Sequence, residues 1–148
     1  TTLHPDIKSD NITSKHMLQT GDVLFAAKGT KNFATVFENH NMAAVASTSF
    51  FVIRITDKTI LPDYLVWFLN LPTIQYLLKS KAWGTAIPSI RKPVLDELEI
   101  TIPPIEKQKI IVKLSKLASN EEEIRTQIAS LQKHLIEQKI LKEINNSK

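Results

Sequence analysis

Apolar residues recur every three or four positions along the C-terminal part of the chain, from Pro103 to Ile144. This spacing puts them on one face of a helix and predicts a long amphipathic helix that begins near Pro104. From Ile124 the steps are four, three and four, which is the heptad spacing of a coiled coil, so we expect a partner helix. The positions expected to pair are Ile110, Leu114, Leu117, Ile124, Ile128, Leu131 and Leu135. The alternative is an exposed helix that folds back on its own domain.

Two local signals bear on the course of this helix. Pro103 and Pro104 end an extended segment and preset the backbone for a helix, and Glu106 places a negative charge in the first turn. Further along, residues 119–122 (Ser-Asn-Glu-Glu) have the pattern of a capping box, which marks a helix start. We therefore expect a kink or a restart of the helix at Ser119.

The part of the chain before this helix has the pattern of short strands. Val23 to Ala27 is an apolar run typical of a buried strand, and it follows a turn at residues 18–22. Further strands are predicted where apolar and polar residues alternate or where β-branched and aromatic residues gather. Segments rich in asparagine or other polar residues separate these strands. These further strands are expected at Phe33–Phe37, at Ala43–Ala46 with Phe50–Ile55, and at Leu98–Ile102.

Two short helices are predicted between the strands. Pro62 to Leu69 begins with proline and shows helical spacing, and Thr73 to Lys81 follows Pro72 in the same way. Gly84 to Pro93 is expected to be an irregular loop. The whole pattern predicts an α+β fold with a small, mixed, β-rich domain at residues 1–103 and a long helical, coiled-coil segment at residues 104–148.

The composition narrows the class of protein. The chain has 148 residues, 43% of them hydrophobic, no cysteine, and no apolar run of the length that crosses a membrane. We therefore expect a cytoplasmic protein without disulfides, thiolate metal sites or membrane contact. Because the chain opens at Thr1 rather than at a methionine, we expect a processed product or a piece of something larger.

The sequence contains no recognisable set of catalytic residues. The three glycines, Gly21, Gly29 and Gly84, are too scattered for a dinucleotide or phosphate-binding loop, so no nucleotide cofactor is expected. The histidines have no partner at the spacing that helical zinc sites use. Asp63 with Glu137 and Lys139 could form a nuclease-like set, but dozens of residues separate its two parts. We therefore predict no catalytic and no metal site.

Positive charge gathers in two places within the globular part. The formal net charge is +4, and the first place holds Lys28 and Lys31 on a stretch without acidic residues. The second surrounds Gly84 and holds Lys79, Lys81, Arg91 and Lys92, with no acidic residue between them. Such side chains can bind phosphates, although solvated lysines on ordinary loops remain the alternative reading.

Four segments, taken in order with the heptad tail, resemble the specificity subunits of Type I restriction-modification systems. They are residues 18–30 (LQTGDVLFAAKGT), 44–53, 84–90 (GTAIPSI) and 98–108 with its IPPIEKQ entry into the helix. The family consists of target-recognition domains, each followed by a long helix, and the two helices of a subunit pair antiparallel. Separate modification and restriction subunits methylate adenine and cleave DNA.

This resemblance implies a non-catalytic module for sequence-specific DNA recognition. The implied partners are double-stranded DNA, the modification (methyltransferase) and restriction subunits, and a second copy or second half-subunit bound through the long helix. A complete subunit of that family has two recognition domains and two helices, so the resemblance implies that this sequence, with one helix, corresponds to half a subunit or less and to a recognition domain without its usual N-terminal portion. The alternative function is a helical scaffold that does not bind DNA.

The basic loops and the resemblance together give a set of residues expected to contact DNA phosphates. Family members recognise different sequences with the same motifs, so Gly84 to Ile90 is expected to act as scaffold rather than to read bases. The expected DNA-binding residues are Lys28, Thr30, Lys31, Lys79, Lys81, Thr85, Arg91 and Lys92.

Overall fold

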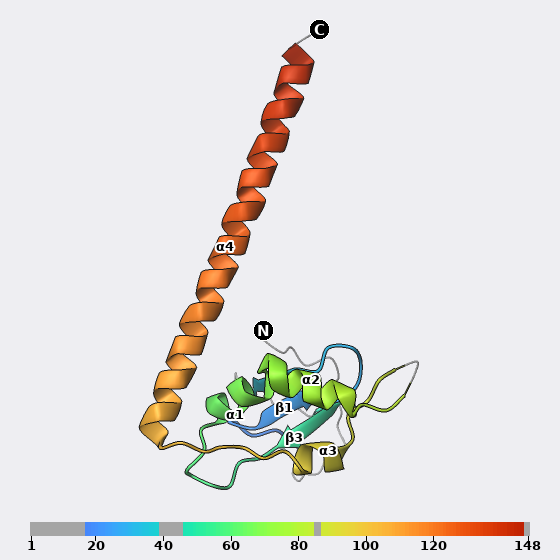
Figure 1. Cartoon of the computed structure of the whole chain (residues 1–148), viewed down its shortest axis with the longest axis vertical. Helices are drawn as coiled ribbons and strands as arrows, with labels where there is room; N and C mark the ends of the chain where they lie inside the picture. Colours follow the sequence, from blue (N-terminus) through green and yellow to red (C-terminus); the bar gives the residue numbers. More distant parts are fainter. Residues whose placement is uncertain (1–16, 39–45, 85–86, 147–148) are drawn as a thin grey trace. The chain divides into compact units, whose positions relative to one another are not determined.

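The computed structural model describes residues 17–38, 46–84 and 87–146. Figure 1 shows a small sheet with short helices and one long C-terminal helix, so the predicted α+β class is confirmed. In chain order the strands are β1 (Val23–Ala26), β2 (Ala34–Val36) and β3 (Phe50–Ile53). The helices are α1 (Pro62–Leu69), α2 (Pro72–Ser80), α3 (Lys92–Asp96) and α4 (Ile105–Asn146).

The three strands form one antiparallel sheet in the order β2-β1-β3. The central strand β1 pairs Val23 with Val36 of β2 on one side and with Ile53 of β3 on the other. All four residues of β1 are buried, as its apolar run predicted, because a central strand covered on both faces has no side exposed to water. The main hydrophobic core forms around Val23 and Phe25, with Leu65, Leu69, Leu78 and Ile90.

Some predicted strands are shorter than expected, and one is wrong. β2 covers Ala34–Val36 and β3 ends at Ile53. Ala46 is not in a strand, and residues 43–45 lie outside the described part of the chain. Leu98–Ile102 forms no strand: Leu98 and Ile100 pack against the core, and the Thr101 carbonyl accepts a hydrogen bond from the Tyr64 hydroxyl at 2.7 Å. The apolar residues of this segment therefore pack against the core and do not pair in the sheet.

Helices α1 and α2 cover one face of the sheet (Figure 1). As predicted, each helix has a proline in its first turn. Backbone N–H groups in the first turn have no partner within the helix, so a proline there costs no helical hydrogen bond. Asn70, at the C-terminal end of α1, joins this helix to the edge strand β2. Its side-chain oxygen accepts from the backbone N–H of Ala34 at 2.8 Å, and its side-chain nitrogen donates to the Ala34 carbonyl at 2.9 Å.

The expected irregular loop from Gly84 to Pro93 ends earlier than predicted. α3 begins at Lys92 and includes Pro93, so the end of that expected loop is a short helix. Pro93 stands in the first turn of α3, where proline is tolerated best.

The long helix α4 runs without interruption from Ile105 to Asn146, so the predicted start near Pro104 is confirmed and the predicted restart at Ser119 is wrong (Figure 1). Strong helix formers flank Ser119 on both sides, among them Leu117, Glu121 and Glu122. With helical hydrogen bonds available in both directions, the backbone at Ser119 does not need the alternative bonding that a capping box supplies.

The chain divides into two compact units within α4, unit 1 at residues 1–112 and unit 2 at residues 113–148. The first turns of α4 belong to unit 1, and Gln108 in these turns is fully buried. The described residues of unit 2 are all helical, and apart from the partly exposed Ser115 their side chains are exposed. Within the described residues, no helix is both long enough and apolar enough to span a membrane.

Candidate nucleic-acid interface

The two basic segments found in the sequence lie side by side in unit 1. Lys28 and Ser89 form an isolated antiparallel bridge, and Ser89 forms a second such bridge with Trp83. The backbone N–H of Gly29 donates to the Pro88 carbonyl at 2.9 Å, and the N–H of Ile90 donates to the Ala27 carbonyl at 2.8 Å. These bonds place residues 28–29 beside residue 83 and residues 88–90. We call the described residues of the two basic segments, 28–31, 79–84 and 87–92, the basic loop surface.

This surface is fixed to the core at two points. Ala27 extends the buried strand β1, and Ile90 is only 1% exposed and belongs to the main core cluster. Inside the turn that follows β1, the side chain of the buried Asn32 donates to the Ala26 carbonyl at 2.9 Å. These anchors hold the backbone of residues 26–32 and 88–90 against the core, next to the basic side chains of Lys28 and Arg91. The scaffold role expected for residues 84–90 stays a prediction.

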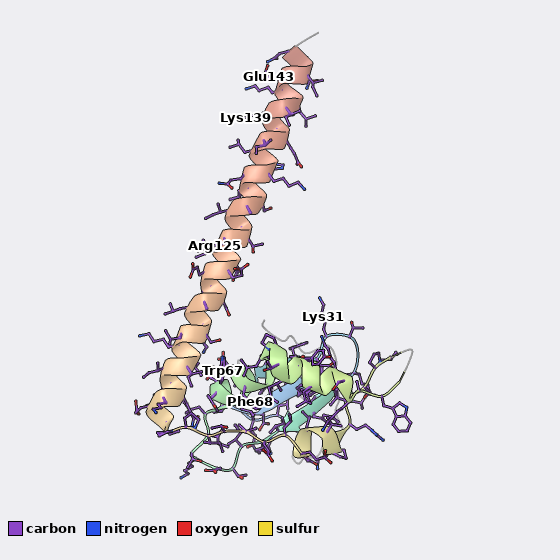
Figure 2. All side chains as sticks on the ribbon, in the orientation of Figure 1. Lys31, Trp67, Phe68, Arg125, Lys139 and Glu143 are labelled. Carbon is purple, nitrogen blue, oxygen red and sulfur yellow. The ribbon has the colours of Figure 1, made fainter. Side chains whose placement is uncertain are left out.

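All the described candidates for DNA contact are exposed: Lys28, Thr30, Lys31, Lys79, Lys81, Arg91 and Lys92. Figure 2 shows the Lys31 side chain pointing away from the sheet. Thr85 lies outside the described residues.

Two of these cations have acidic neighbours that the sequence pattern did not indicate. Lys81 Nζ lies 3.7 Å from a carboxylate oxygen of Glu97, and Lys92 Nζ lies 3.6 Å from one of Asp96. Both pairs are long and exposed, so each reduces the local positive charge only in part. Within the described part of the chain, Lys28, Lys31, Lys79 and Arg91 form no salt bridge.

One residue on this surface was not among the sequence-based candidates. Trp83 is 65% exposed, and the guanidinium carbon of Arg91 lies 4.4 Å from the centroid of its ring. This is within the range of a cation–π contact. The sequence did carry a signal, because Trp83 stands in a stretch from residue 64 to residue 95 that contains four Lys or Arg residues and no acidic residue.

An ion pair between the buried Asp22 and the exposed Arg54 supports the turn before β1. Asp22 is 2% exposed, and Arg54 donates to its two carboxylate oxygens at 2.8 and 2.7 Å. The hydrogen bond from Arg54 holds the pKa of Asp22 below its ordinary value of 3.8, and the backbone N–H of Gln19 adds to this effect. Both oxygens of this carboxylate accept hydrogen bonds from Arg54, and one also accepts from the backbone N–H of Gln19, so the pair holds the turn together. Across residues 17–38, 46–84 and 87–146, no cluster of three acidic or histidine side chains could hold a metal ion.

The apolar stripe of α4 is exposed along its whole length, from 50% at Ile128 to 69% at Leu131. It comprises all seven positions expected to pair: Ile110, Leu114, Leu117, Ile124, Ile128, Leu131 and Leu135. Beyond Leu135 the apolar residues Ile136, Ile140 and Ile144 are equally exposed. At about 100° per residue they lie on a face turned by roughly 130° from the stripe. The heptad pattern therefore changes direction in the last turns, which the sequence analysis did not detect.

The chain is similar to the Type I restriction enzyme MjaVIII specificity subunit of Methanocaldococcus jannaschii, with 33% identity over 63 residues. That match covers 43% of this chain and 15% of the relative, so the chain corresponds to a small part of the relative's length. A family model described as the Type I restriction modification DNA specificity domain matches residues 7–133. Because this match includes most of the chain, the protein belongs to the Type I restriction modification DNA specificity domain family.

Proposed function

We propose that unit 1 binds duplex DNA through the basic loop surface and acts as a non-catalytic recognition module of a Type I restriction-modification complex in the cytoplasm. One observation carries the proposal: two basic segments more than 45 residues apart in sequence are hydrogen-bonded to each other, at Gly29 with Pro88 and at Ala27 with Ile90. Membership of a DNA-specificity family supports the same function.

The physical basis is the attraction of fixed cations to the DNA backbone. Lys28, Lys31, Lys79 and Arg91 are exposed and carry no salt bridge within the described residues, so they can neutralise phosphates and release condensed counterions. Phosphate contacts of this kind fix the register and orientation of a domain on the duplex, and side chains that reach base edges supply specificity.

For α4 we propose pairing with a second helix, supplied by another copy of the chain or by a second half-subunit. Its exposed apolar stripe has the heptad spacing that pairs helices, and an unpaired stripe of this length would be unusual on a monomer. Two copies paired antiparallel would present two recognition domains with two-fold symmetry. Methyl transfer and cleavage would then belong to modification and restriction subunits bound by this assembly.

The proposal is tested by measuring the affinity of the full chain for fluorescently labelled duplex DNA at several salt concentrations. We expect log Kd to rise linearly with log salt, with a slope set by the number of phosphates contacted. Absence of binding at low salt would contradict the proposal and favour a helical scaffold without DNA binding. Heparin, a polyanion without bases, is the control for charge alone.

A further inference from the structure

We propose that Trp83 stacks against a nucleobase of the bound DNA and that Ile87 assists by contacting the same base step. The inference rests on the proposed function, because it concerns the same basic loop surface. It assigns Trp83 a contact with the bases themselves, whereas the lysines and Arg91 are assigned to phosphates.

The first observation is how the apolar side chains around this site are distributed. Leu78 and Ile90 are 0% and 1% exposed, so they are fully used in the core. Trp83 and Ile87, which lie between them in sequence, are 65% and 67% exposed. Large apolar side chains that are mostly exposed to water can mark a binding surface, and tryptophan is the side chain with the largest apolar area.

The second observation is that the backbone of Trp83 itself is paired with that of Ser89. Trp83 and Ser89 exchange two backbone hydrogen bonds, at 2.9 and 2.8 Å. Gly84 has a φ of +107°, and a Cβ atom added there would lie 2.9 Å from the Ile87 carbonyl oxygen, so only glycine fits without a shift. A side chain on such a fixed backbone loses little conformational freedom on binding, which favours a role in recognition.

The third observation is charge, and it indicates which partner the indole meets. The Arg91 guanidinium lies 4.4 Å from the ring centroid of Trp83, and Lys28 is bridged to Ser89, which is itself the bridge partner of Trp83. An aromatic ring beside cations matches the alternation of bases and phosphates in a nucleic acid. A partner made of apolar protein would have to bury these cations without a matching negative charge, which is unfavourable.

In an intact duplex the faces of the bases are covered by their neighbours. A stacking contact from Trp83 therefore requires a base step to open, as it does where apolar wedges enter the duplex and kink it. We expect local unstacking of the DNA where Trp83 binds.

The first test compares two variants on the same duplex. Trp83→Ala should weaken binding by about 5- to 150-fold, the range for loss of one base–aromatic stack, and should leave the salt slope unchanged because no phosphate contact is lost. Arg91→Ala should instead reduce the slope by about one unit. Trp83→Phe should recover part of the affinity. Emission from Trp67, in helix α1, reports that the Trp83 variants are folded.

The second test uses the fact that the chain has two tryptophans, Trp67 and Trp83. In the variant Trp67→Phe, duplex DNA should quench Trp83 emission and shield it from acrylamide, whereas heparin should do neither. Trp83→Phe, which keeps only Trp67, is the matched control and should show no change.

The outcomes separate this inference from the proposed function. If the duplex binds with a normal salt slope but Trp83 emission and acrylamide access do not change, the stacking contact is refuted and the proposed function stands. If Trp83 is shielded by partner protein subunits and not by DNA, the site is a protein contact and the inference is overturned. If no duplex binds at low salt, both fall together.

Discussion

The side-chain oxygen of Gln108 accepts a hydrogen bond from the backbone N–H of Leu61 at 2.9 Å, across 47 positions of sequence. The side-chain nitrogen of Gln108 donates to the carbonyls of Thr59 and Pro103, both at 2.7 Å. Gln108 is 0% exposed, so this one side chain satisfies three backbone groups where α4 enters unit 1. The first turns of α4 are thereby tied to the residues that precede α1.

Replacing Gln108 should therefore destabilise unit 1. Gln108→Leu keeps a similar volume but leaves one backbone N–H and two carbonyls without this partner, and we expect a loss of about 2 kcal/mol or more. Urea unfolding followed by tryptophan fluorescence measures it, since both tryptophans lie in unit 1. The matched control is Lys107→Ala, one residue away and exposed, which should change stability little. Equal unfolding midpoints for the two variants would contradict the role given to Gln108.

The Asp22–Arg54 pair should make stability depend on acid pH. The hydrogen bond from Arg54 lowers the pKa of Asp22 in the folded chain, so the carboxylate adds stability above its ordinary pKa of 3.8. This contribution is lost as the pH falls through the folded pKa. Asp22→Asn should therefore be less stable than the parent near neutral pH, and the difference should shrink below about pH 3.8. Urea midpoints at a series of pH values measure this, and a difference that stays constant with pH would contradict it.

If α4 pairs with a second helix, charged residues introduced into its apolar stripe should change the oligomeric state. The chain should be a dimer by light scattering, and replacing Ile128 and Leu131 with glutamate should make it monomeric, because burying carboxylates in a helix pair is unfavourable. The control double variant, Thr126→Glu with Ser130→Glu, adds the same charge on the opposite side of the helix and should stay dimeric. A parent chain that is monomeric at high concentration would refute pairing.

Periodicity was enough to predict the elements whose residues repeat regularly. The helix α4 and the strand β1 were placed correctly, because each follows from the spacing of its apolar residues. The pairing that the heptads of α4 predict stays a prediction. Leu98–Ile102 was misjudged because apolar residues look the same whether they pair in a sheet or pack as an extended segment. The restart expected at Ser119 failed because a capping pattern has no effect inside a run of helix formers.

The candidate site, too, could be predicted from the sequence only in part. Charge along the chain identified Lys28 and Arg91 separately, but only the backbone bonds of Ser89 and Pro88 showed that their loops meet. Glu97 and Asp96 follow the basic segment in sequence, and their approach to Lys81 and Lys92 depends on how α3 and the loops fold. Trp83 and Gln108 were missed because a composition-based search does not tell an exposed indole or a buried amide from ordinary ones.

The most direct test of the account is the salt dependence of duplex binding for four alanine variants. Lys28→Ala and Arg91→Ala remove exposed cations of the basic loop surface, whereas Lys113→Ala and Lys142→Ala remove exposed cations of α4 in unit 2. We predict that the first two each lower the slope of log Kd against log salt by about one unit and weaken binding to all sequences alike. The two α4 variants should match the parent chain. If the α4 variants lose more affinity than Lys28→Ala and Arg91→Ala, DNA binds to the other unit and the proposed interface is wrong.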